Sequence, residues 1–324
     1  MPLTPFLLDR KFLPKVWGGR ALESVFPMQL PPAEMVGETW ELYDRPEGSS
    51  RIRGTDRTLA DLMREAPVEL LGQGVAAGHG GRFPLLLKFI DAREALSVQV
   101  HPDEARARAE GDGGKDEAWV VLRAGPRARI IRGLRPGVER AEFEAKAHTP
   151  EVEKLLWMFT PKAGDCVHLP PGTVHALGPD VVVFELQQNS DLTYRLYDWG
   201  RPREVHVQKA LAVTRHETVQ VGAADRAVTS PAALADGGVQ LVATESYRLR
   251  RYAWRTPHTL ATNSRFAAVT VVGGSGTLVW PSATAVQPLS LVAGDTVLVP
   301  AVVEHVVLSP IGRLDVLVSD PGES

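Results

Sequence analysis

Two histidines and one glutamate in this sequence are suited to bind a divalent metal ion together. His101 ends a polar strand face, Glu117 leads into an apolar strand, and His175 ends a loop that contains two prolines. Two imidazoles and a carboxylate leave coordination positions open for water or substrate, as catalytic metal sites require. Gln99, two residues before His101, is a candidate fourth ligand through its amide oxygen. The alternative is that each is an ordinary rim, core or strand-end residue, and the joint pattern favours the metal site.

The residues around His101 predict a strand with one polar face. Strict alternation in the segment 96–102 places Ser97, Gln99 and His101 on one face and valines on the other. A face made of a hydroxyl, an amide and an imidazole is too polar for a dry core. Pro102 ends the strand directly after His101, so we expect this histidine at the rim of a sheet.

A second alternating segment brings an acid and a base to one face. Asp191 and Arg195 are four residues apart, so in a strand their side chains point the same way. A guanidinium fork suits a phosphate or another anionic oxygen group. The alternative is a surface ion pair of about 0.5 kcal/mol without a function. The neighbouring metal motif favours the functional interpretation.

Composition excludes several classes of protein. The 324 residues predict roughly two domains at ~150 residues each. Lys and Arg total 36 against 39 Asp and Glu, a net charge of −3, which argues against a nucleic-acid-binding protein. A single cysteine excludes an internal disulfide. The N-terminal segment lacks the pattern of a signal peptide and no apolar run is long enough to cross a membrane, so we expect a cytoplasmic protein without a membrane partner.

Short β-branched and aromatic runs bounded by Gly, Pro or Asp predict a mostly β sandwich or barrel. A few short helices are also expected. The clearest begins at Pro150, where Thr149 is suited to cap the first turn. The predicted helical ranges are 56–66, 68–72, 103–110, 138–148 and 150–159.

An internal repeat indicates that the β-unit occurs twice. Gly, Asp, Pro and His recur at an offset of 130 residues, first between Gly164 and His175 and again between Gly294 and His305. In each copy a Gly-Asp turn precedes a short apolar strand, and a proline then leads to the histidine. The second copy has Val302 where the first has a glycine, and no Gln-x-His strand accompanies it. We therefore expect two similar barrels in tandem, the second without a metal.

The spacing Gly164-x5-Pro170-x-Gly172-x2-His175 resembles the second motif of the cupins, a superfamily of metal-binding jelly-roll barrels. More narrowly, several motifs in one order resemble the type I mannose-6-phosphate isomerases, in their compact bacterial form. These are the segments 16–19, 37–41, 84–91, 96–103, 114–119, 170–178 and 185–201.

The resemblance implies specific roles. Family members bind zinc, one ion per chain, at positions that fall here on Gln99, His101, Glu117 and His175, with Gln99 either a ligand or a near neighbour. The family's active-site arginine falls on Arg195. Its accompanying acid falls on Asp191, and the lysine before the glutamate ligand on Lys115. The chain differs from the family's usual sequence motif at Asp116 and Ala118. The extra carboxylate of Asp116 is expected to alter the electrostatics beside the metal.

The implied activity is reversible, zinc-dependent isomerisation of mannose 6-phosphate and fructose 6-phosphate through a cis-enediol. Lys115, Asp191 and a zinc-bound water are candidate proton carriers. Substrate contacts are expected from Ser97, Gln99 and Arg201, with Ser97, Lys115 and Arg201 as candidates for the phosphate. A non-haem Fe(II) cupin oxygenase and a non-catalytic sugar-binding bicupin remain alternatives.

The expected organisation has three parts. Residues 1–216 form the metal-binding catalytic cupin domain, with a small helical insertion near 138–160. Residues 217–238 form a connection, and residues 239–324 form a degenerate cupin domain without metal. The expected partner is a small sugar phosphate, and the chain is expected to be a monomer or a homodimer.

Overall fold

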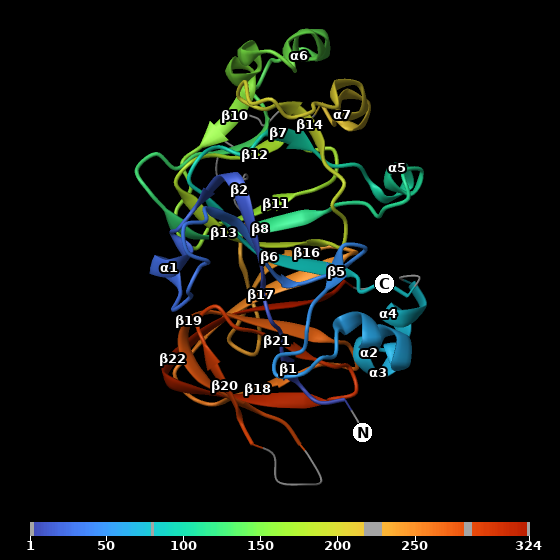
Figure 1. Ribbon diagram of the computed structural model, residues 1–324, viewed down its shortest axis with the longest axis vertical. Helices are drawn as coiled ribbons and strands as arrows, with labels where there is room; N and C mark the ends of the chain where they lie inside the picture. The colour runs from blue at the N-terminus through green and yellow to red at the C-terminus, as the bar shows by residue number, and fades with distance from the viewer. Residues whose placement is uncertain (1–2, 79–80, 217–228, 282–286, 323–324) are drawn as a thin grey trace.

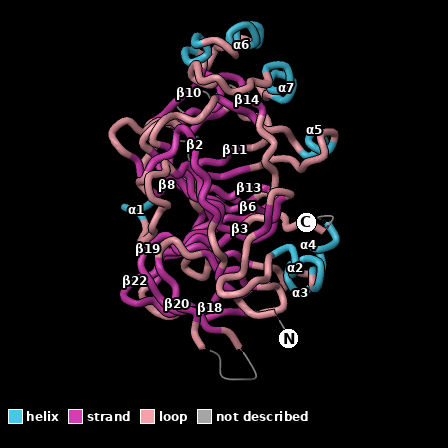
Figure 2. Tube along the Cα trace, viewed as in Figure 1, coloured by secondary structure: helices cyan, strands magenta, loops and turns pink. Residues whose placement is uncertain are grey.

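The computed structural model describes residues 3–78, 81–216, 229–281 and 287–322. Within them the chain forms three large antiparallel sheets and a two-stranded ribbon. The sheets succeed one another along the long axis, with the C-terminal strands at one end and helix α6 (Arg140–Lys146) at the other (Figure 1; Figure 2). The prediction of a mostly β fold is confirmed.

Two sheets pack face to face in the N-terminal two thirds of the chain. An apolar cluster that includes Trp119, Val183, Ile130 and Leu177 fills the space between them. The six-stranded sheet has the order β11 (Cys166–Leu169), β8 (Glu117–Ala124), β13 (Val181–Gln188), β6 (Leu85–Ala92), β3 (Val36–Leu42) and β2 (Lys11–Gly19). The five-stranded sheet has the order β10 (Leu156–Phe159), β9 (Ile130–Leu134), β12 (His175–Leu177), β7 (Val98–Val100) and β14 (Tyr194–Tyr197).

The third sheet is formed by the C-terminal strands together with one strand from the start of the chain. Its order is β1 (Phe6–Leu7), β21 (Thr296–Val299), β19 (Ala267–Val279), β22 (His305–Pro321), β17 (Tyr247–Trp254), β16 (Val239–Ala243) and β15 (Ala232–Ala233). Strand β18 (His258–Ala261) pairs with β22, and β20 (Leu289–Val292) pairs with β19. A large apolar cluster, including Phe89 and Phe184 on one side and Leu249 and Leu317 on the other, joins this sheet to the six-stranded one.

The repeat seen in the sequence is also present in the structure. Strands β11 and β21 begin 130 residues apart, and so do β12 and β22, which open on His175 and His305. Gly164 and Gly294 both adopt a positive φ, of 95° and 97°. In each copy the backbone N–H of this glycine donates to a strand carbonyl at 2.8 Å, from Val121 in the first copy and from Val271 in the second. The same turn geometry is therefore built twice.

The described helices are short and lie outside the sheets. Helices are present at four of the five predicted helical ranges. The helix predicted over 68–72 begins one residue earlier, at Pro67. The fifth range, 150–159, is not a helix throughout. The helices are α1 (Leu22–Val25), α2 (Leu59–Glu65), α3 (Pro67–Leu71), α4 (Gln73–Gly78), α5 (Glu104–Arg108), α6 and α7 (Val207–Val213). The small ribbon pairs β4 (Asp44–Arg45) with β5 (Gly48–Ser49).

The prediction of a helix over 150–159 is wrong in its second half. A 3-10 turn spans Pro150–Lys154, and the chain then extends into β10, which pairs with β9. Thr149 does not cap the turn, because its hydroxyl donates to the Lys146 carbonyl oxygen instead. Pairing with a neighbouring strand therefore overrides the helical spacing of Leu155, Leu156 and Phe159.

Part of the predicted connection at 217–238 lies outside the described residues, which resume at residue 229. Among the residues that are described, no helix has the length and apolar character needed to cross a membrane.

Candidate metal centre and active-site cavity

The three proposed metal ligands come from both of the facing sheets. Glu117 opens β8 of the six-stranded sheet, His175 opens β12 of the five-stranded sheet, and His101 directly follows β7. The two histidine segments are joined, because the Gly172 N–H donates to the His101 carbonyl oxygen at 2.8 Å. Gly172 has a φ of 85°, and a Cβ there would lie 2.6 Å from Arg215 Cγ, so only glycine fits this turn.

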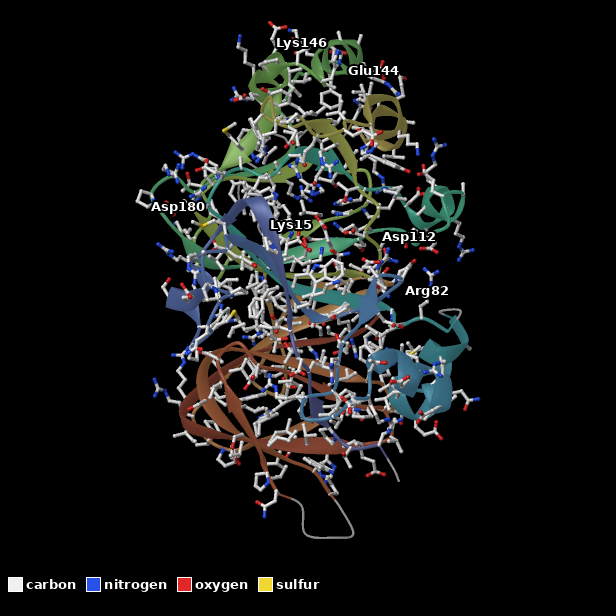
Figure 3. All side chains as sticks on the ribbon, viewed as in Figure 1. Lys15, Arg82, Asp112, Glu144, Lys146 and Asp180 are labelled. Atoms are coloured by element: carbon white, nitrogen blue, oxygen red, sulfur yellow. The ribbon has the colours of Figure 1, made fainter. Side chains whose placement is uncertain are left out.

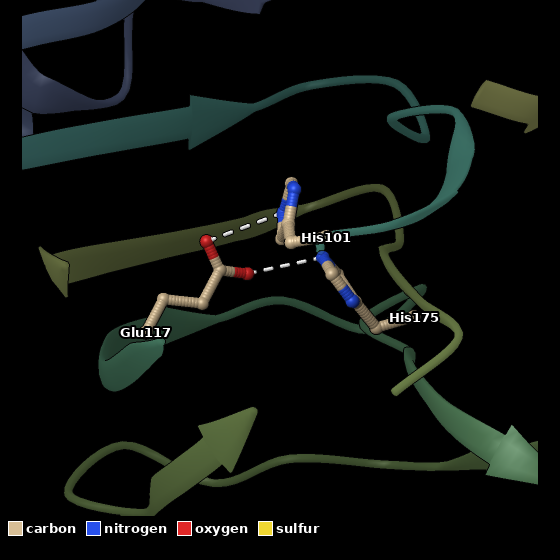
Figure 4. A group of neighbouring side chains, drawn as sticks. All are labelled: His101, Glu117 and His175. Atoms are coloured by element: carbon tan, nitrogen blue, oxygen red, sulfur yellow. Dashed lines mark ion pairs between the residues drawn. The ribbon is translucent and has the colours of Figure 1, made fainter. Parts of the chain in front are cut away.

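The three side chains converge on one buried point (Figure 4). Glu117 Oε1 lies 3.0 Å from His175 Nε2, and Glu117 Oε2 lies 3.5 Å from His101 Nε2. One ligand atom from each residue lies within 4.8 Å of the others, and all three residues are at most 1% exposed. The residues that the sequence nominated as metal ligands are thus together in space.

Backbone carbonyls fix the tautomer of both imidazoles. His101 Nδ1–H donates to the Leu192 carbonyl oxygen at 3.0 Å, and His175 Nδ1–H donates to that of Thr173 at 2.9 Å. In the neutral rings the lone pair is then on Nε2, the atom that faces Glu117. Burial, together with the nearby Lys115 ammonium, lowers the pKa of His101 to about 3, so this ring is neutral near pH 7.

Lys115 and Gln99 complete the immediate surroundings. Lys115 Nζ lies 2.8 Å from Glu117 Oε2 and 3.1 Å from His101 Nε2. Burial alone would raise the pKa of Glu117, but the Lys115 charge and the interactions with His101 and His175 together outweigh it, and the pKa falls well below its usual range. Gln99 Nε2 lies 3.2 Å from His175 Nε2, so the Gln99 amide also touches the cluster.

This donor set fits a divalent cation. Glu117 Oε1 is buried without a hydrogen-bond partner, Oε2 is paired with the Lys115 ammonium, and two imidazole lone pairs point towards this carboxylate. Acceptors that face one another in a dry site need a cation between them. Imidazole nitrogen and carboxylate oxygen are common zinc ligands. The geometry therefore defines a candidate metal site.

A polar cavity of about 200 Å³ lies next to the cluster. Ser97, Gln99, Lys115, Asp191 and Arg195, which the sequence nominated for substrate or proton transfer, all line it. Burial, and then the positive charge of Arg203, lowers the pKa of the Arg195 guanidinium.

Arg201 is the nominated residue that the structure does not bring to this cavity. Its guanidinium donates to the Ala95 carbonyl oxygen at 2.7 Å and lies 2.8 Å from the Asp198 carboxylate. Arg203, two residues further on, lines the cavity and donates two hydrogen bonds, of 2.6 and 2.7 Å, to the same Asp198 carboxylate. Arg201 therefore does not line this cavity, whereas Arg203 does.

Sequence reasoning missed a charged wall on the opposite side of the cavity. Lys88 Nζ lies 3.0 Å from Glu185 and 3.9 Å from Glu38, whose other oxygen lies 3.2 Å from Lys15 on β2. Lys15 is labelled in Figure 3. Burial by itself would raise the pKa of Glu38, but Lys88 and Lys15 outweigh it and lower the pKa to about 2. Trp119 Nε1–H donates to Glu185 at 2.8 Å. The sequence signal that could have revealed this wall is a single charged residue inside an otherwise apolar strand, namely Lys88 in β6 and Glu185 in β13.

The extra carboxylate at Asp116 has partners other than the metal ligands. Asp116 Oδ1 lies 2.8 Å from His168 Nε2 and accepts from the Tyr247 hydroxyl at 3.3 Å. Tyr247 belongs to β17 and is fully buried. Asp116 therefore connects the C-terminal sheet to the segment that leads into the strand of Glu117, and its effect on the electrostatics beside the metal stays a prediction.

The fold and the site together define a class: a mostly β enzyme of the cupin fold with a candidate metal centre between two sheets. Residues 6–119 match the family model for the catalytic domain of type I phosphomannose isomerase.

Relatives and solved structures agree with that match. Mannose-6-phosphate isomerase ManA of Bacillus subtilis is 36% identical over 66% of this chain and 69% of its own, and the Streptococcus mutans mannose-6-phosphate isomerase is 36% identical over 64% and 67%. A crystal structure of the mannose 6-phosphate isomerase from Bacillus subtilis superposes with a TM-score of 0.85 at 30% identity, covering 98% of this chain and 99% of that one. The chain belongs to the type I mannose-6-phosphate isomerase family.

Proposed function

We propose that this enzyme interconverts mannose 6-phosphate and fructose 6-phosphate, with zinc bound by His101, Glu117 and His175. The observation that carries the proposal is the buried cluster of three ligand atoms beside a polar cavity. Five cationic and three anionic side chains line the described part of that cavity, a balance that suits an anionic sugar phosphate. We propose one zinc per chain, with Gln99 either a fourth ligand through its amide oxygen or a near neighbour of the ligands.

The reaction moves a proton between C2 and C1 of the sugar, and negative charge develops on the oxygens. A bound zinc would supply Lewis acidity for that charge. Arg195 adds a positive charge on the cavity wall for the anionic substrate as a whole. Ser97 and Gln99 offer hydroxyl and amide groups to the sugar hydroxyls.

Two residues of the chain are candidate proton carriers. Lys115 is the closer to the cluster, 2.8 Å from Glu117, and it also lines the cavity. Asp191 is exposed at the rim of the same cavity. We propose that Lys115 and Asp191 hold or move the proton during ring opening and isomerisation.

The proposed domain organisation follows the internal repeat, with one copy in each domain. Residues 1–216 would form the catalytic cupin domain, and residues 239–324 a second cupin domain without metal. This is supported by the matched turns at Gly164 and Gly294. It is also supported by the single cluster of metal-ligating side chains in the described residues, which includes His175 and not His305.

A coupled assay tests the function. Fructose 6-phosphate formed from mannose 6-phosphate is measured for the purified enzyme, after chelation, and after zinc is added back. Activity that is lost on chelation and restored by zinc supports the proposal. Full activity in metal-depleted enzyme would refute the role of zinc. Iron content with oxygen uptake in place of isomerisation would refute the reaction.

A further inference from the structure

A row of side chains crosses the five-stranded sheet away from the metal cluster. His175 pairs in register with Gln99, and Gln99 pairs with Arg195 on the next strand. Arg195 in turn exchanges two hydrogen bonds with His206: its N–H donates to His206 Nδ1 at 3.2 Å, and its carbonyl accepts from the His206 N–H at 2.7 Å. Two strand spacings separate His175 from Arg195, about 10 Å. A sugar phosphate with its reacting carbons at the cluster would extend along this row.

The cations of the cavity differ in how they are paired. Lys15, Lys88 and Lys115 each have a carboxylate within 3.2 Å. Among the described residues, Arg195 has no carboxylate within ion-pair distance, and its Nε is buried without a hydrogen-bond partner. Its Nη1 donates only to the Glu204 carbonyl oxygen, at 3.1 Å. A buried guanidinium N–H without an acceptor beside a cavity indicates an anionic ligand.

Arg203 and His206 line the same cavity as Arg195, and each has an N–H group that is free to donate a hydrogen bond to a ligand. Asp198 holds Arg203 through Nε and Nη2, and no hydrogen bond involves Arg203 Nη1 in the part of the chain that the structure describes. Because His206 Nδ1 accepts from Arg195, the neutral ring carries its proton on Nε2. The nearest carboxylate to that Nε2 is Glu204 at 3.9 Å, on a side chain that is 83% exposed.

We propose that Arg195, Arg203 and His206 bind the phosphate group of the substrate, and that Arg203 determines specificity for phosphorylated sugars. This rests on the proposed function, since the cluster end of the row is taken as the site of isomerisation. The two arginines supply charge-assisted hydrogen bonds to the phosphate oxygens, and His206 a further donor. Asp198 is a positioning residue, because its two hydrogen bonds fix the Arg203 fork.

The test compares Arg203→Ala with Arg201→Ala. Both variants remove one arginine from the same Asp198, but only Arg203 lines the cavity. For Arg203→Ala we expect KM for mannose 6-phosphate and Ki for inorganic phosphate to rise about tenfold or more, with kcat changed less and zinc content unchanged. Arg203→Lys should recover part of the loss. Arg201→Ala should keep both constants within about twofold of the wild type.

Several results would overturn the inference. Equal effects of Arg203→Ala and Arg201→Ala would mean that only the Asp198 ion pair matters. An unchanged Ki for inorganic phosphate in Arg203→Ala would remove Arg203 from the subsite while leaving the isomerase function intact. If the wild type does not isomerise mannose 6-phosphate, the function fails separately. In that case the wild type and Arg203→Ala are titrated with inorganic phosphate by calorimetry. Weaker phosphate binding by Arg203→Ala would support the phosphate subsite, and equal binding would refute it.

Discussion

Replacing His175 by alanine should remove the metal, whereas replacing His305 should not. The two histidines occupy the same place in the two copies of the repeat, at the start of β12 and of β22. His175 contributes one of the three clustered ligand atoms, while His305 belongs to no such cluster in the described residues. His305→Ala is therefore a matched control for the loss of an imidazole.

The expected magnitude follows from the number of ligands. Loss of a residue that merely supports a ligand weakens metal binding about 10–100-fold, so loss of one of three ligands should cost about 100-fold or more. A 100-fold weaker affinity removes about 2.7 kcal/mol of the stabilisation that the metal gives the fold. In the presence of zinc, the melting temperature of the variant should lie about 4 °C or more below that of the wild type.

Zinc per chain is measured by elemental analysis after dialysis, affinity by competition with a chelator, and melting by calorimetry with and without zinc. His175→Ala should be free of zinc and inactive, and its melting temperature should no longer respond to zinc. His305→Ala should match the wild type in all three. Stoichiometric zinc in His175→Ala, or its loss from His305→Ala, would refute the assignment of the metal to the first copy.

Three further substitutions probe the surroundings of the site. Glu38→Gln removes a carboxylate whose pKa is about 2 in the fold against 4.5 ordinarily, so Glu38 stabilises the fold above about pH 4.5 and loses this effect as the pH falls towards 2. Urea unfolding should show a difference from the wild type of about 3 kcal/mol at pH 7 that shrinks below pH 4.5; a difference independent of pH would contradict this. Tyr247→Phe removes the hydroxyl that donates to Asp116 at 3.3 Å, and should lower the free energy of unfolding by about 1 kcal/mol; an unchanged urea midpoint would speak against that bond. Gly172→Ala should reduce zinc affinity because its Cβ meets Arg215 Cγ at 2.6 Å, whereas Gly54→Ala, with a φ of 77° and open space around it, should leave affinity unchanged. Equal chelator-competition curves for these two glycine variants would exclude a role for the turn.

The metal cluster could be predicted from the sequence because each ligand lies in a local pattern. Alternation ended by Pro102 places His101, and the Pro-x-Gly spacing places His175. Lys88 and Glu185 were missed for a physical reason. They face each other in register across β6 and β13, but both strands are buried on both faces, so period-two patterning is absent.

The other places where the structure could not be predicted from the sequence are those where tertiary contacts decide. Segment 156–159 has helical spacing, yet pairing with β9 makes it a strand. Arg201 and Arg203 lie in an irregular segment after β14, where no periodicity fixes which guanidinium turns inward. Asp116 looked like a neighbour of the metal because it precedes Glu117 in the chain, but successive side chains of an extended segment point in opposite directions.

The pairing of β1 with β21 has a consequence for how the chain is made on the ribosome. Phe6 and Leu7 pair with Leu298 and Val297, about 290 residues further along the chain. The segment of Phe6 and Leu7 must therefore remain unpaired until this distant segment has been synthesised. Such a long-range closure is slow, and it leaves the edge of β21 available to foreign strands until Phe6 and Leu7 cover it.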